Sequence, residues 1–114
     1  MSARTIELVR NLCATWSSLR PLWLEHLEDN EGEVLPHLLL SDVVRWMSSS
    51  ELEPHRARCD ETWRWLAVQY QSGDSDVRDL TVVSGVKMIP DPGSPGSGQR
   101  AFLDPQLRAL DPWR

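Results

Sequence analysis

Apolar side chains recur every three or four residues along most of this chain, and this spacing constrains the fold more than any other feature. It is the period of an α-helix that packs one side against a core. The clearest stripe consists of Cys59, Trp63, Leu66, Ala67 and Tyr70. Serines and glycines interrupt the pattern near residues 17–18, 32, 48–50 and 73. The sequence therefore predicts an all-α fold of five to six antiparallel helices.

Residues that commonly begin helices stand before each periodic stretch. They are Ser2 or Thr5, Pro21, Pro36, Glu53–Pro54, Ser75 for a fifth helix reaching about Met88, and Asp104–Pro105 for a short last helix. The valine-rich stretch 82–89 could instead form a short strand, although the chain offers it no clear partner strand. The short connections favour a stack of helical hairpins or a HEAT-like bundle. We expect one domain over residues 1–114, with a flexible Pro/Gly/Ser loop at 90–99.

The charge balance bounds the class of partner. Lys and Arg number 12 against 17 Asp and Glu, which gives a formal net charge of -5. Nucleic acid is therefore not an expected partner, because phosphate binding needs clustered cations. The N-terminal stretch lacks the apolar segment of a signal peptide, and no run is long enough to cross a membrane. We expect a cytoplasmic protein without membrane contact.

Reactive residue types are present but do not form a catalytic or metal-binding motif. His26, His37 and His55 lack any ligand spacing typical of metal sites, so we interpret them as surface or helix-end residues. Cys13 and Cys59 fall on apolar stripes in mid-helix, where cysteines are usually buried and inert. The sequence predicts no metal, no cofactor and no enzymatic activity. A small enzyme with an unrecognised site is the remaining alternative.

One segment is strongly acidic and joins two apolar helical stretches. Residues 25–33 contain no Lys or Arg and include Glu25, Glu28, Asp29, Glu31 and Glu33. Such a segment attracts basic partners, but it can also serve solubility alone. Of the tryptophans, Trp16, Trp46 and Trp63 fall on predicted core stripes. Trp23 and Trp65 are either partner anchors or packing residues. We take these two and the five carboxylates as candidate partner-binding residues.

A longer stretch, residues 27–47, resembles a family of small uncharacterised bacterial helical proteins. The resemblance rests on an acidic turn followed by a helix, with Glu28, Gly32, Glu33, Leu35, Pro36 and His37 and then Leu40, Asp42, Val43, Arg45 and Trp46. Residues 76–93 and 102–110 are similar to the last two helices of that family. The chain departs from the pattern at 84–86, where Ser-Gly-Val stands in place of bulkier residues.

These relatives in turn resemble immunity proteins of bacterial polymorphic toxin systems. The resemblance implies an antitoxin-like protein that binds a cognate toxin domain with a basic surface and occludes it. A helical adaptor module without a toxin partner is the alternative function.

Overall fold

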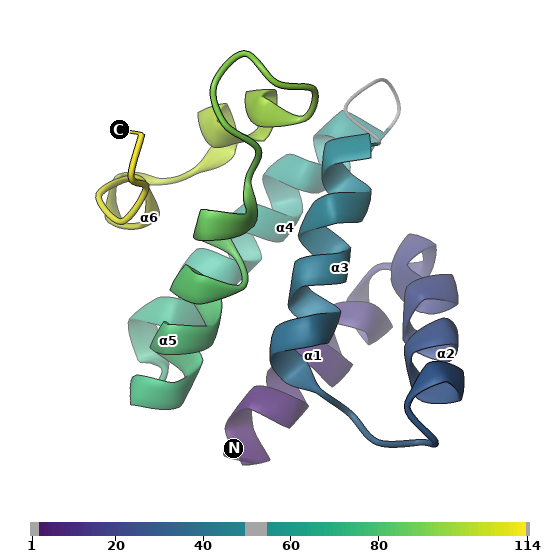
Figure 1. Cartoon of the computed structure of the whole chain (residues 1–114). Helices are drawn as coiled ribbons and strands as arrows, with labels where there is room; N and C mark the ends of the chain where they lie inside the picture. Colours follow the sequence, from purple (N-terminus) through teal and green to yellow (C-terminus); the bar gives the residue numbers. More distant parts are fainter. Residues whose placement is uncertain (1–2, 50–54, 114) are drawn as a thin grey trace.

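The computed structural model of the chain describes residues 3–49 and 55–113. Within these ranges the chain forms six α-helices, three short 3₁₀-helices and no strand (Figure 1). The α-helices are α1 (Ala3–Thr15), α2 (Arg20–Asp29), α3 (Pro36–Ser49), α4 (His55–Ser72), α5 (Ser75–Val83) and α6 (Pro105–Arg108). The 3₁₀-helices are η1 (Ser17–Leu19), η2 (Val86–Met88) and η3 (Ser97–Phe102). The all-α prediction is confirmed, and 82–89 is not a strand.

Successive long helices run in opposite directions, as the short connections predict (Figure 1). Helix α1 contacts α2, α3 and α5, and α4 contacts α3 and α5. The Cα radius of gyration is 13.2 Å, close to the value of about 13 Å expected for a compact domain of this length. A compact bundle therefore describes the fold better than an extended array. None of the described helices is both long and apolar enough to span a bilayer.

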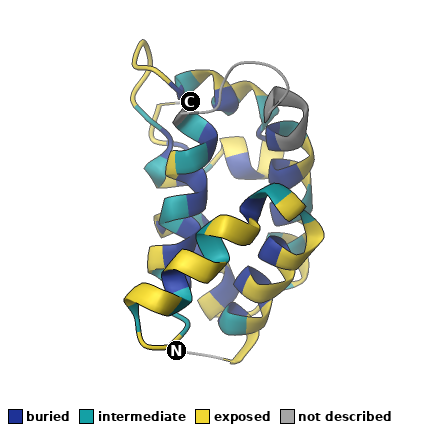
Figure 2. Ribbon diagram, turned by 90° about the vertical axis from the view of Figure 1, so that its right-hand side faces the viewer, coloured by how far each residue is buried: buried dark blue, intermediate teal, exposed yellow. Residues whose placement is uncertain are grey.

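The core lies where the inner sides of α1, α3, α4 and α5 meet, and Figure 2 shows these sides buried and the outer sides exposed. Trp63 is its largest fully buried side chain. The predicted stripe on α4 is confirmed, because Cys59, Leu66 and Ala67 are buried beside Trp63 and Tyr70 packs against them. Helix α2 differs from the other long helices. Its one buried residue is His26, so α2 is a flank of the bundle.

The structure confirms some predicted helix starts and corrects others. Pro36 and Pro105 begin α3 and α6, and Pro21 is the second residue of α2. Asp104 caps α6 by accepting a hydrogen bond from Leu107 N at 2.9 Å. Thr5 is not a cap, because it lies inside α1 and is buried. The predicted starts at Ser2 and at Glu53–Pro54 lie outside the described residues.

Helix α5 differs from its prediction at both ends. Asp74, not Ser75, is the N-cap, and its carboxylate accepts from Val77 N at 2.9 Å. The helix ends at Val83 instead of Met88. Gly85 lies so close to the preceding turn that an added Cβ would meet the Thr81 carbonyl oxygen at 2.3 Å. The chain turns there, and the following residues Val86 and Ile89 enter the core.

The C-terminal part of the chain packs back onto the helices. The indole N–H of Trp63 donates to Gln99 Oε1 at 3.0 Å, and Gln99 Nε2 donates to Ser48 Oγ at 2.7 Å. Arg100 forms an ion pair of 2.7 Å with the buried Asp111. The segment predicted as a Pro/Gly/Ser loop therefore has a buried end, since Gly96 and Gln99 are buried. Through the contact between Gln99 and Trp63, the C-terminal segment covers the core at Trp63.

Candidate functional site

The acidic connector, residues 25–33, is shaped by a buried histidine. His26 is only 4% exposed. Its Nε2 accepts a hydrogen bond from the backbone N–H of Leu35 at 2.9 Å. Asn30 ends α2, and its side chain donates to the His26 carbonyl oxygen at 2.8 Å. The interpretation of His26 as a surface residue is wrong. It is a helix-end residue that ties the connector to α2.

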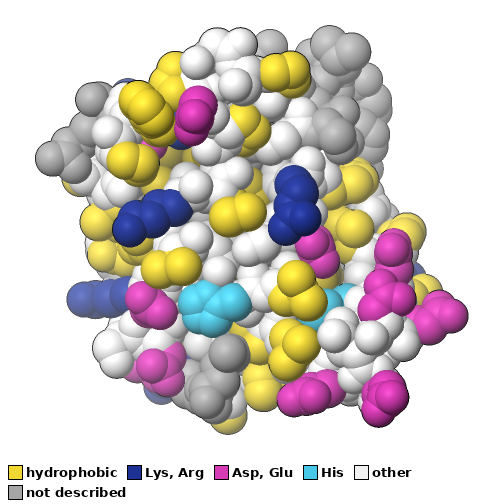
Figure 3. All heavy atoms as spheres, viewed as in Figure 1, with side chains coloured by type: hydrophobic (Ala, Val, Ile, Leu, Met, Phe, Trp, Pro, Cys, Tyr) yellow, Lys and Arg dark blue, Asp and Glu magenta, His cyan; other side chains and the backbone are white. Residues whose placement is uncertain are grey.

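All five carboxylates of the connector are exposed, as predicted. Figure 3 shows Asp and Glu side chains gathered at the lower right, over α2 and the following turn. Within the described part of the chain, none of the five forms an ion pair with Lys, Arg or His. The connector therefore presents uncompensated negative charge to the solvent.

Several of these carboxylates occupy positions that disfavour folding. Glu28 and Asp29 lie in the last turn of α2, where the helix dipole disfavours negative charge. Glu25 and Asp29 are four residues apart on one helix, a spacing at which like charges repel. Glu31 has a φ of 54°, a left-handed conformation that glycine adopts at lower energy. Local stability does not explain the choice of residues here.

A groove of about 620 Å³ lies beside the connector, between α2 and α3. Its lining comes from one side of each helix: Leu22, Glu25, His26, Asp29 and Asn30 from α2 and its cap, and Leu38, Asp42, Arg45 and Trp46 from α3. The α3 residues recur every three or four positions on the side away from the core. This groove places the connector carboxylates Glu25 and Asp29 next to apolar surface.

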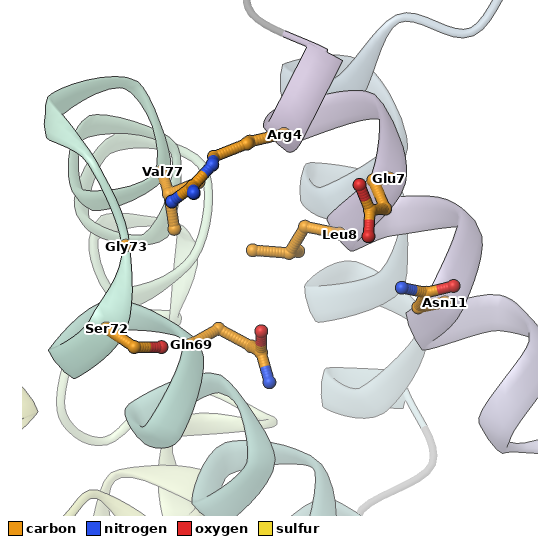
Figure 4. A pocket seen from close by; sticks show the side chains of 8 residues that line it. All are labelled: Arg4, Glu7, Leu8, Asn11, Gln69, Ser72, Gly73 and Val77. Carbon is orange, nitrogen blue, oxygen red and sulfur yellow. The ribbon is translucent and has the colours of Figure 1, made fainter.

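A second hollow lies between α1 and the turn that joins α4 to α5. Figure 4 shows Arg4 and Leu8 reaching from α1, and Gln69 from α4, into the space between these elements. Its volume of about 240 Å³ is below the roughly 300–1,000 Å³ typical of small-molecule sites. The groove between α2 and α3 falls within that range and contains predicted site residues, so we treat the groove and the connector as the candidate site.

The two candidate tryptophans lie elsewhere on the surface. Trp23 is half-buried and lines a separate hollow with Arg10 and Arg20. Trp65 is half-buried, and its ring packs edge-on against Trp16 at a centroid distance of 6.0 Å. The structure brings neither of them into the groove. Their role as partner anchors stays a prediction.

Of the residues that line the groove, sequence reasoning assigned only Glu25 and Asp29 to a candidate site. Trp46 was predicted as core, but it is half-buried and lines the groove. Leu38 is 44% exposed, and Asp42 faces the same groove. The signal was present in the spacing of residues 38, 42, 45 and 46, which fall opposite the core side of α3. Trp16 and Trp46 are half-buried and pack against the core, whereas Trp63 is fully buried as predicted.

The remaining reactive residues have structural surroundings. His37 lies in the first turn of α3, and its Nδ1 is 2.6 Å from Ser84 Oγ, a contact that joins α3 to the end of α5. Cys13 and Cys59 are buried and form no disulfide, and burial raises the pKa of Cys13 to about 11. The described residues contain no group of three His, Cys, Asp or Glu that could hold a metal ion. The side chain of His55 lies outside the description.

Comparison of the chain with protein-family models, with curated proteins and with solved structures gives no match.

Proposed function

We propose that this protein is an immunity-type inhibitor, which binds a basic surface of a toxin domain through the acidic connector and so occludes the toxin. The observation that carries the proposal is the placement of the five connector carboxylates. They are exposed and unpaired, and several lie where negative charge or an L side chain disfavours folding.

Residues that oppose stability are commonly retained because function needs them. Solubility alone is a weaker explanation, because exposed acidic residues at ordinary helix positions would serve it without this energetic cost. Concentrated negative charge speeds association with a basic partner and disfavours wrong partners. The charges therefore support recognition of a cationic protein surface.

The position of the connector is suited to occlusion. His26 and Asn30 fix the turn by hydrogen bonds, so the carboxylates are held on a preorganised surface. A preorganised surface loses less conformational entropy on binding than a mobile loop. Once the connector is bound, the helical bundle next to it can cover the adjoining surface of the partner.

The test is growth rescue. Candidate toxin domains with a basic surface are each expressed with the chain in a bacterial host, with the chain either as wild type or with Glu28, Asp29, Glu31 and Glu33 changed to amides. We expect wild type to restore growth and to co-purify with the toxin, and the variant to do so more weakly. A matched variant neutralises four exposed carboxylates outside the connector, namely Glu7, Asp76, Asp79 and Asp91. Equal rescue by the two variants would contradict a role for the connector.

A single substitution separates function from folding at one residue. Glu31→Gly removes a carboxylate and relieves the left-handed backbone, so it should raise the free energy of unfolding by about 1 kcal/mol. If the carboxylate serves recognition, the same change should weaken binding to the partner. A variant that is more stable and binds equally well would show that Glu31 has no part in recognition.

A further inference from the structure

We infer that the groove between α2 and α3 binds an amphipathic helix of the partner, with apolar side chains on the groove floor and Arg or Lys side chains at its acidic rim. This inference rests on the proposed function and deepens it. It assigns a docking site and a chemical class of ligand to residues that adjoin the connector.

The floor of the groove is apolar and open. Leu38 is 44% exposed, and Leu22 and Trp46 are half-buried beside it. Leu38, Asp42 and Arg45 follow the spacing of one helix side, and Leu22, Glu25 and Asp29 follow the same spacing on α2. The two helix sides together form the walls of the groove. An amphipathic helix binds such a groove with apolar anchors at positions i, i+3, i+4 and i+7. The volume of about 620 Å³ gives room for several side chains.

The rim of the groove selects for positive charge. Glu25 and Asp29 lie on α2 one turn apart, and Asp42 faces them from α3. The structure itself shows a guanidinium at this rim, because Arg45 lies 3.5 Å from Asp42. That pair is loose and exposed, so its contribution to stability is small, typically about 0–1 kcal/mol. A partner's guanidinium can take the place of Arg45 at little energetic cost.

The same charges disfavour other occupants. A nucleic acid would bring phosphates against three carboxylates. A second copy of this chain carries a net charge of -5 and would meet the rim with repulsion. A basic helix combines the apolar and the electrostatic features of the site, and we therefore commit to it.

The test uses a synthetic helical peptide of about 15 residues, with leucines at three- and four-residue spacing and arginines flanking them. Affinity is measured by fluorescence anisotropy, and the site is located by the indole N–H resonance of Trp46, assigned with Trp46→Phe. We expect this resonance to shift on binding, while that of the buried Trp63 does not. A peptide with glutamates in place of the arginines should not bind.

Two protein variants carry the same change in charge. The groove variant combines Glu25→Gln, Asp29→Asn and Asp42→Asn, and the connector variant combines Glu28→Gln, Glu31→Gln and Glu33→Gln. We expect the groove variant to lose about tenfold or more in affinity, and the connector variant to lose no more than about threefold. Leu38→Ser should also weaken binding while leaving the salt dependence unchanged.

Other outcomes overturn the inference. Equal losses in the two charge variants would mean that the patch acts only through its overall field, and the groove assignment would fail while the proposed function stood. An unshifted Trp46 resonance would place the peptide elsewhere. Concentration-dependent dimerisation that involves the Trp46 resonance would make a second copy the occupant. Conversely, if the peptide binds the groove but the wild-type protein does not restore growth, the proposed function would be wrong and the docking site would still be supported.

Discussion

The Nε2 atom of His26 accepts a hydrogen bond of 2.9 Å from the backbone N–H of Leu35, across nine residues of chain. Because a backbone N–H can only donate, Nε2 is the acceptor in this bond. The bond joins the end of α2 to the residue that precedes α3. It fixes the turn that presents the carboxylates and places α2 beside the groove.

We predict that His26→Phe lowers the free energy of unfolding by about 1–3 kcal/mol, because the ring volume is kept while the buried N–H of Leu35 loses its acceptor. Urea denaturation measures the change. Glu28→Gln, an exposed substitution on the same helix, should change stability by less than about 0.5 kcal/mol. Equal stability of the two variants would show that the His26 bond does not hold the connector.

Gly96 and Gly93 offer a matched pair of substitutions in the C-terminal segment. Both have positive φ, 91° and 89°. A Cβ on Gly96 would meet Ser48 Cβ at 2.4 Å, whereas one on Gly93 would meet nothing within 4 Å. Gly93→Ala should therefore cost only the left-handed backbone, about 1–2 kcal/mol, and Gly96→Ala about 1–3 kcal/mol more. Similar thermal denaturation of the two variants would contradict the packing of this segment on α3.

Two ion pairs in the chain should differ greatly in their contribution to stability. Arg100 and Asp111 are 16% and 2% exposed, whereas Arg64 and Asp60 are 71% and 40% exposed. Asp111→Ala removes the carboxylate partner of a partly buried guanidinium, which then keeps only its backbone carbonyl acceptors at Pro90 and Ile89, and should cost about 3–5 kcal/mol. Asp60→Ala should cost at most about 1 kcal/mol. Chemical denaturation of both variants tests the contrast, and a loss below about 1 kcal/mol for Asp111→Ala would mean that the tail is not anchored there.

Trp63 should dominate the core energetically. Its side chain is fully buried, and its indole N–H donates to Gln99. Trp63→Ala should lower the free energy of unfolding by about 3–5 kcal/mol. Trp65→Ala should cost less, because that ring is half-buried. If Trp63→Ala costs less than about 1 kcal/mol, the helix packing described above is wrong.

The sequence was sufficient to predict the helices because the apolar period and the proline starts are local signals. It also placed the exposed carboxylates of the connector and the buried cysteines correctly. The end of α5 was missed because the apolar pattern continues beyond it: Val86 and Ile89 are buried although they follow the turn at Gly85 and are not part of the helix.

The site was only partly predictable for a similar reason. His26 stands among acidic residues and looks exposed, yet the return of the chain at Leu35 buries it. One wall of the groove is the side of α3 that faces α2. The sequence around α3 does not show which helix packs on that side. The C-terminal segment was predicted from composition as a loop, whereas its contact with Trp63 joins residues 36 positions apart.

We propose that the carboxylates of the connector steer a basic partner. The most direct test measures association rates of wild type and of the variant with Glu28, Asp29, Glu31 and Glu33 changed to amides, at several ionic strengths, with the toxin domain that the growth assay identifies. We predict that the variant associates about tenfold more slowly at low salt, with a flatter salt dependence and with stability unchanged or slightly raised. The off-connector variant of Glu7, Asp76, Asp79 and Asp91 should remain closer to wild type. Equal association rates for all three proteins at every ionic strength would contradict the account and leave the carboxylates a role in solubility alone.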